Sequence, residues 1–297
     1  MAQHGEIALR AEVVDATIKG MAARMYKFKQ AVSIVPTSAI SNVYWTESAA
    51  VVSAKGEGNA FEGVPFGANF PHAVADHTRR QSNIVKHAVE TNIAWELIKS
   101  SEIDVQGRNL FKLTEGITKS VDDNIYTDIQ ENQNSVGGTP KNINFIRITQ
   151  LEEWTNSASS AIVDVMNNAA QLIGEHNYST ANLMMFVNLR DRRSIMDYVY
   201  SKGSQTPSLA TDVAINGHIT KLSGIDIIES NSVPASAALV VVPKICATWK
   251  AFEPLTTDTT VDPLKSVRIR VIEEGILQLT DPKAVCLIVN TQRASDV

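Results

Sequence analysis

A helical apolar stripe across residues 7–35 constrains the fold of this chain more than any other feature. The stripe consists of Ile7, Ala11, Val14, Ile18, Met21, Met25, Phe28, Val32 and Val35. These residues follow one another at spacings of four and three, so they lie along one side of a helix. Pro36 ends the pattern, and Gly20 argues against a long free-standing coiled coil. The stripe needs an apolar partner, and the sequence favours its own body and a neighbouring subunit equally.

The segment from residue 40 to about 92 has the pattern of a long hairpin. Residues 43–46 and 78–90 have the composition of strands, and residues 50–54 are a further short candidate. The connection between them is rich in Gly and Pro, which mark turns and extended backbone. A two-stranded hairpin is barely stable alone. We therefore expect it to project from the body and to be completed by a partner surface.

A second amphipathic helix is expected over residues 110–129. Its stripe, again at spacings of three and four, is formed by Leu110, Leu113, Ile117, Val121, Ile125 and Ile129. About 20 residues of helix span roughly 30 Å. Asp122 and Asp123 are expected to face solvent. Because adjacent helical residues point in different directions, the two are poorly placed as a catalytic acid and base.

The second half of the chain mixes the two periodicities. Helices are expected at residues 157–173, 190–200 and 244–252. Strands are expected at residues 183–187, 219–223, 225–229, 238–242, 267–272 and 284–290. Strands and helices of this length in this order indicate an α+β fold.

Charge and composition describe a folded globular chain of 297 residues. The net charge is −5, whereas proteins that grip DNA phosphates usually have a basic excess. A protein that encloses nucleic acid as a container, without binding its phosphates, can be mildly acidic. We expect no secretory signal, no membrane-spanning segment and no membrane partner, because no apolar run approaches the roughly 20 residues that a span needs.

Cys246 and Cys286 sit in apolar runs, which predicts buried thiols in a reducing cytoplasm.

The familiar catalytic signatures are missing from the sequence, so we expect no catalytic, cofactor-binding or metal-binding residues. His72, Asp76 and His77 form the one histidine cluster, but a structural zinc site usually needs four ligands. The basic run 190–193 could meet nucleic acid or a neighbour's carboxylates, although a solvated helix face is the favoured interpretation. A covalent cross-link through Lys55 has no support in the sequence.

Four segments, taken in order, resemble the major capsid proteins of tailed bacteriophages and related archaeal viruses. The segments are residues 64–71, 93–105 leading into the long helix, 222–234 and 281–285. Each consists of apolar and turn residues, and their order carries the resemblance. It implies the α+β capsid fold named after phage Hong Kong 97.

The resemblance also implies a division of the chain. Residues 1–38 would be the N-terminal arm and 39–92 the extended loop. Residues 93–150 and 264–297 would form the peripheral domain, and residues 151–263 the axial domain. The short stretch before Ile40 leaves little room for a cleaved scaffolding segment, which implies a separate scaffold or none.

The implied function is a non-catalytic shell subunit. Its copies would form pentamers and hexamers in a closed icosahedral shell around double-stranded DNA, without sequence-specific binding. Portal, scaffold and decoration proteins would be further partners. The chain would be located in the virion, which would be assembled in the host cytoplasm. Candidate contacts between subunits are Ile7, Val14, Ile18, Met21, Met25, Phe28, Lys55, Phe61, Phe66, Phe70, Arg79, Arg80, Arg190 and Arg192.

Two alternatives remain open from the sequence. An encapsulin-like nanocompartment resembles the same fold but holds a protein cargo. A small-molecule enzyme would instead use the α/β half, with a ligand at strand ends near residues 188–193 or 231–234.

Overall fold

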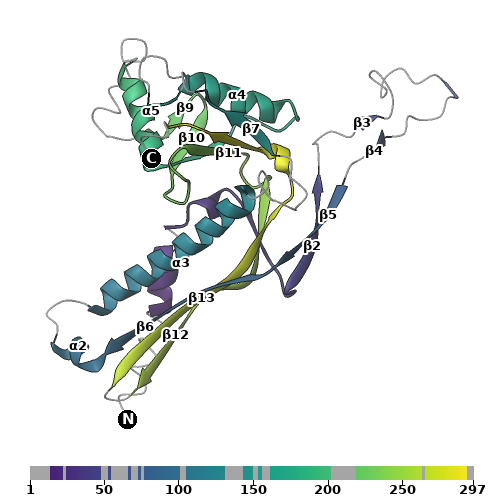
Figure 1. The fold of residues 1–297 in the computed structure, drawn as a ribbon. Helices are drawn as coiled ribbons and strands as arrows, with labels where there is room; N and C mark the ends of the chain where they lie inside the picture. Colours follow the sequence, from purple (N-terminus) through teal and green to yellow (C-terminus); the bar gives the residue numbers. More distant parts are fainter. Residues whose placement is uncertain are drawn as a thin grey trace.

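The computed structural model shows two β-sheets, one above the other, with a long hairpin projecting to one side (Figure 1). A single long helix runs beside both sheets. The structure describes residues 14–22, 25–47, 53–54, 66–67, 73–74, 77–100, 105–130, 143–149, 153–155, 161–201, 219–262 and 265–292.

The lower sheet is built around a long antiparallel strand pair. Its order is β1 (Ser33–Pro36), β12 (Ala247–Asp262), β13 (Ser266–Leu279) and β6 (Val85–Ala94). Burial alternates along β6, where His87 and Ile93 are buried and the residues beside them are exposed. This period of two means that one face is covered and the other is open to solvent.

Two helices cover the buried face of the lower sheet. The helix α3 (Val105–Gln130) packs on β13 and β6, and the helical residues 14–22 join the same apolar cluster through Ile18. The side chain of Thr257 on β12 donates a hydrogen bond to Asp15 at 2.6 Å. The predicted helix at residues 110–129 is thus present and extends further in both directions. The short helix α2 (Trp95–Ser100) lies between β6 and α3.

The upper sheet has six strands, and its buried residues form much of the main apolar core. Its order is β7 (Asn144–Arg147), β14 (Val285–Val289), β11 (Ala237–Val241), β8 (Met184–Val187), β10 (Ile225–Glu229) and β9 (Lys221–Leu222). Every residue of β11 is buried, as expected for an apolar strand covered on both faces. The helix α4 (Ile162–Gly174) packs on β14 and β7. The helix α5 (Leu189–Ser201) adds Ile195 and Val199 to the same core.

The predicted hairpin is present. The strands β2 (Ser41–Glu47) and β5 (His77–Asn83) pair antiparallel along their whole length. Further out, β3 (Ser53–Ala54) pairs with β4 (Ala73–Val74). Figure 1 shows this arm extending away from both sheets.

Two sequence predictions on secondary structure are wrong. The helix expected at residues 244–252 is the start of β12, where Ala247 and Trp249 are buried and Thr248 and Lys250 are not. The spacing of three from Cys246 to Trp249 fits a helix equally well, but sheet pairing decides the outcome.

The helical stripe expected to reach residue 35 ends earlier. Ser33–Pro36 forms the edge strand β1, which pairs in parallel with β12. The residue before a proline avoids the helical region, and proline is tolerated in an edge strand.

The sheets divide the chain differently from the predicted domain boundaries. β7 and β14 come from the segments assigned to the peripheral domain, yet they pair in the upper sheet. β12 comes from the segment assigned to the axial domain, yet it pairs in the lower sheet. The chain therefore passes between the two sheets close to residues 242–246 and 280–284. The predicted domain boundaries stay a prediction.

A close approach in the lower sheet gives a first prediction. A Cβ atom on Gly275 would lie 2.5 Å from the Trp249 ring and 2.9 Å from the Lys250 carbonyl oxygen. We expect Gly275→Ala to lower the free energy of unfolding by about 1–3 kcal/mol, because the backbone carbonyl cannot move aside. Urea denaturation of the unassembled chain measures this change.

The matched control is Gly116→Ala on the exposed side of α3, where a Cβ meets nothing within 4 Å. It should raise the stability by about 1 kcal/mol, the helix preference of Ala over Gly. Equal effects of the two substitutions would contradict the packing seen around Trp249.

Candidate assembly surface

Large exposed apolar side chains gather along β1 and β2. Ile34, Val35, Ile40, Val43 and Trp45 are all exposed, Ile40 to 71% and Trp45 to 56%. Val85 and Ile245 are also exposed, at the start of β6 and in the loop before β12. We call the seven residues the apolar strip. A cluster of large exposed apolar side chains marks a candidate contact surface.

The hairpin owes its apolar outer face to strand alternation. Val43 and Trp45 point to the same side, where Gln81 and Arg79 are their cross-strand partners. On the inner side, Tyr44 and Thr46 are buried. The inner side is also tied to the lower sheet, since Gln278 donates a side-chain hydrogen bond to Ser82 at 2.9 Å. Arg79 is therefore exposed on the outer side, while Arg80 is half-buried on the inner side.

The predicted contact residues of the N-terminal stripe differ in how deeply they are buried. Ile18 and Phe28 are fully buried in this chain's own cores. Val14, Met21 and Met25 are half-buried. The part of the stripe that the structure describes is thus covered mainly by the same chain, one of the two alternatives that the sequence left open.

The other predicted contact residues are spread over the chain. Phe66 is fully exposed at a turn of the extended arm. Arg190 is exposed on α5, whereas Arg192 forms an ion pair with Glu229 at 2.9 Å. Ile7, Lys55, Phe61 and Phe70 lie outside the described residues, as do His72 and Asp76. The roles of these residues between subunits remain predictions.

A buried charged cluster, which sequence reasoning missed, joins residues 26–29 to α3 and β13. Lys29 forms an ion pair with Glu273, and the Tyr26 hydroxyl donates to the same carboxylate. The Lys29 ammonium lies 3.7 Å from the Tyr26 ring centroid. Burial lowers the pKa of Lys29 and raises that of Tyr26. A sequence pattern could not reveal the cluster, because its members are more than 240 residues apart.

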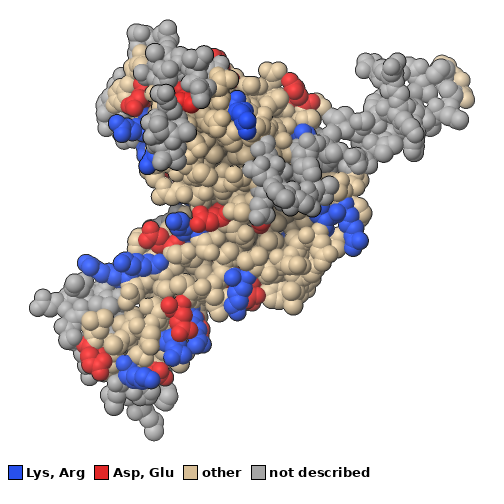
Figure 2. All heavy atoms as spheres, in the orientation of Figure 1, with Lys and Arg blue, Asp and Glu red and all other residues tan. Residues whose placement is uncertain are grey.

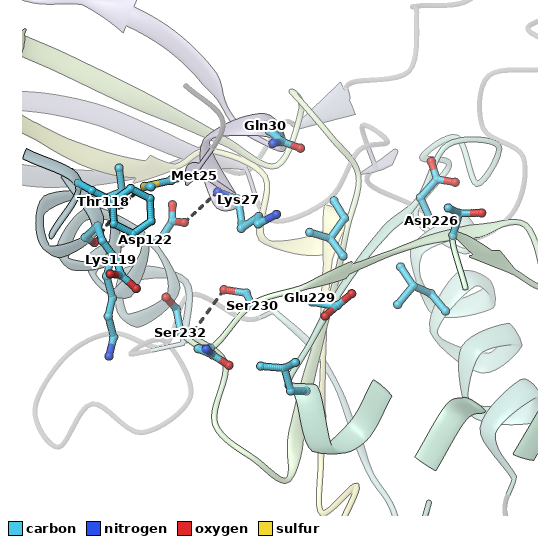
Figure 3. A pocket seen from close by; sticks show the side chains of 17 residues that line it. Met25, Lys27, Gln30, Thr118, Lys119, Asp122, Asp226, Glu229, Ser230 and Ser232 are labelled. Carbon is cyan, nitrogen blue, oxygen red and sulfur yellow. Dashed lines mark hydrogen bonds between the residues drawn. The ribbon is translucent and has the colours of Figure 1, made fainter. Parts of the chain in front are cut away.

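Asp122 corrects a prediction, because it is buried and does not face solvent. Its carboxylate accepts a hydrogen bond from the backbone N–H of Lys27 at 2.9 Å (Figure 3). It thereby ties Lys27, the residue before the short 3₁₀ helix Phe28–Gln30, to α3. Burial raises the pKa of Asp122 to about 6.

A groove of about 790 Å³ lies between α3, residues 25–30 and the loop after β10 (Figure 3). Its lining mixes Lys27 and Lys119 with Glu115, Asp226 and Glu229. Within the described ranges, His, Cys, Asp and Glu side chains form no group of three that could hold a metal ion.

The strand ends that the enzyme alternative proposed as a ligand site are brought together beside this groove. There the Asn188 side chain donates to the Val233 carbonyl oxygen at 2.7 Å. The two stretches therefore contact each other directly.

Surface charge on the visible face is mixed, with basic and acidic side chains interspersed (Figure 2). No helix in the described parts of the chain combines the length and apolar character of a membrane span. Cys246 and Cys286 are buried free thiols, as predicted, and burial raises the pKa of each to about 12.

Comparison with known proteins identifies the fold. No family model and no curated protein matches the sequence. Among solved structures, the virus-like particle from Pyrococcus furiosus has a TM-score of 0.60 at 13% identity, over 94% of this chain and 99% of that one. The capsid of cyanophage P-SCSP1u has a TM-score of 0.63 at 13% identity, over 89% and 88%. The capsid of the native GTA particle has a TM-score of 0.61 at 12% identity, over 92% and 91%.

These similarities cover almost the whole chain and confirm the predicted α+β fold of the Hong Kong 97 capsid type. At this level of identity they establish the fold of the chain. The resemblance noted in the sequence is thus confirmed by the three-dimensional arrangement.

The buried carboxyl group gives a second prediction. The pKa of Asp122 rises from 3.8 to about 6 on folding, so the folded state binds more protons between these values. Stability therefore falls as the pH rises through this window, by on the order of 2–3 kcal/mol. Asp122→Asn keeps the hydrogen-bond acceptor without the charge. We expect the variant to exceed the wild type in stability at pH 7.5 but not at pH 4.

Urea denaturation at the two pH values measures this difference. Asp123→Asn is the control, because the neighbouring side chain is partly exposed. A stability difference between wild type and Asp122→Asn that is the same at both pH values would disprove the assignment.

Proposed function

We propose that this chain is a major capsid protein whose copies assemble into a closed icosahedral shell around double-stranded DNA. The apolar strip carries this proposal, because a subunit with a capsid fold exposes it along an edge strand and a projecting hairpin. The structural similarity to capsid proteins supports the same role. The role is structural and non-catalytic.

The physics of the hairpin supports assembly through contacts with other copies. β2 and β5 form a two-stranded arm, which gains stability from a partner surface. Trp and Arg, the side chains most enriched at interface hot spots, occur opposite each other as Trp45 and Arg79 on its outer face. Contacts between an arm and a different surface of the next copy are heterologous, and they close into rings when the rotation is suitable. Pentamers and hexamers are such rings.

The proposed contents are DNA held without sequence-specific binding. A net charge of −5 and a mixed surface favour a wall that does not grip phosphates. In this proposal, residues 1–38 are the N-terminal arm and 39–92 the extended loop. The strands β12 and β13 of the lower sheet belong to the peripheral domain, and the upper sheet corresponds to the axial domain. The location is the virion, assembled in the host cytoplasm, with portal, scaffold and decoration proteins as further partners.

Negative-stain microscopy and sedimentation of the purified full-length chain test the proposal. We expect particles or capsomers of megadalton size. A chain that stays monomeric under every assembly condition would overturn the proposal. Particles from a native source should contain nuclease-protected DNA, whereas a co-purifying protein cargo would favour a nanocompartment.

A third prediction concerns the apolar strip. We expect the double substitution Val43→Ser and Trp45→Ser to raise the concentration needed for assembly at least tenfold. Burial of each large apolar side chain contributes roughly 1.5–3 kcal/mol, and 1.4 kcal/mol corresponds to a factor of ten. Sedimentation at several protein concentrations measures the change.

Leu97→Ser on α2 is the matched control, since Leu97 is 49% exposed and Val43 is 48% exposed. The helix α2, which carries Leu97, lies at the far end of the lower sheet from the hairpin (Figure 1). If the double variant assembles at the same concentration as wild type, the outer face of the hairpin is not a contact surface.

A further inference from the structure

The two sheets are linked by chain crossings that lie side by side. Residues 242–246 lead from β11 to β12, and residues 280–284 lead from β13 to β14. The Asp281 N–H donates to the Cys246 carbonyl oxygen at 3.1 Å, and the Thr280 hydroxyl donates to the Ile245 carbonyl oxygen at 3.3 Å. Two short connections at one place can form a hinge. The helix α3 braces them, because its apolar stripe enters the cores of both sheets.

Residues 26–32, which we call the strap, provide a second brace. The Phe28 ring stacks on Phe186 of β8, with centroids 4.2 Å apart, and also lies 6.0 Å from Tyr126 of α3. The Ala31 carbonyl oxygen accepts a hydrogen bond at 2.6 Å from the N–H of Lys244, inside the first crossing. The strap then continues into β1, which pairs with β12. It is thus bonded to the upper sheet, to the lower sheet and to the crossing between them.

The ion pair between Lys29 and Glu273 fastens the strap to the lower sheet. Their side chains are only 12% and 3% exposed, and the Lys29 ammonium lies 5.4 Å from the centroid of the Trp249 ring. Breaking a buried ion pair by removing one partner is strongly destabilising, because it leaves an uncompensated charge. Replacing both partners by neutral groups is often harmless. The intact pair therefore contributes little net stability, whereas the loss of one partner alone is costly.

We propose that the strap holds the two sheets at one relative angle, that the Lys29–Glu273 pair is its lock, and that a chain with the lock broken rocks about the two crossings. The proposal concerns a single subunit. It goes beyond the proposed function. In an assembled shell, rocking of the two sheets would let one sequence occupy both pentamers and hexamers.

Spin-label distances in the full-length chain test the proposal directly. Labels on cysteines introduced by Arg193→Cys in α5 and Thr260→Cys in β12 report the angle between the sheets. Cys246 and Cys286 are buried and escape labelling. Labelled chain is diluted with unlabelled chain, so that contacts between copies do not contribute. With Lys29→Met, we expect the distance distribution to become at least twice as wide.

Hydrogen exchange provides the second readout. The Lys244 amide, which donates to the strap, should exchange at least tenfold faster in Lys29→Met. Lys19→Met is the matched control, because Lys19 forms an exposed ion pair with Asp15 in the helix preceding the strap. It should change neither readout. Lys29→Met with the width and exchange rate of this control would overturn the proposal.

Two further measurements keep the test decisive if Lys29→Met does not fold. The double substitution Lys29→Met and Glu273→Gln also removes the ion pair but leaves no unpaired buried charge, so it should fold, and its distance distribution should be broad, as expected of a chain without the lock. A distribution as narrow as that of wild type there would refute the lock. In wild type, the amides of Lys27 and Lys244 should exchange together and faster than that of Val240 in β11, because the strap opens locally. Exchange of all three at one rate would refute the strap.

Discussion

The apolar stripe of α3 is divided between two cores, and the rest of the structure depends on this division. Leu113 and Ile117 pack on the lower sheet together with Ile269 and Val271. One or two turns later, Val121, Ile125 and Ile129 enter the core of the upper sheet. Because one rigid helix contributes to both cores, the two sheets are joined by more than their chain crossings. The same helix supplies Asp122, whose carboxylate accepts a hydrogen bond from the backbone N–H of Lys27 in the strap.

The surface residues of the body fall into a polar and an apolar group. The polar face of the lower sheet carries a ladder in which Glu90 pairs with Arg268 and Arg270. Exposed ion pairs of this kind contribute little stability but keep the face soluble. Large apolar side chains are instead concentrated on β1 and on the outer face of the hairpin. The surface thus separates a polar face from the apolar strip.

Local periodicity in the sequence was enough to predict α3, the hairpin and most strands of the upper sheet. Each of these elements has either a long stripe or a short apolar run, and its burial follows from its own residues. β12 and β1 could not be predicted in this way, because their conformation depends on pairing with strands that are distant in the sequence. Asp122 and Glu273 were missed for the same reason. A carboxylate on a helix or strand looks solvent-facing until the segment that covers it is known.

The upper-sheet position of β14 has a consequence for synthesis on the ribosome. β14 lies between β7 and β11, so the sheet stays split until residue 289 has been made. β1 likewise waits for its partner β12, more than 200 residues later in the chain. At 5–20 residues per second, this delay is roughly 10–40 s. The nascent chain therefore carries an unpaired β1 and an open sheet for most of its translation.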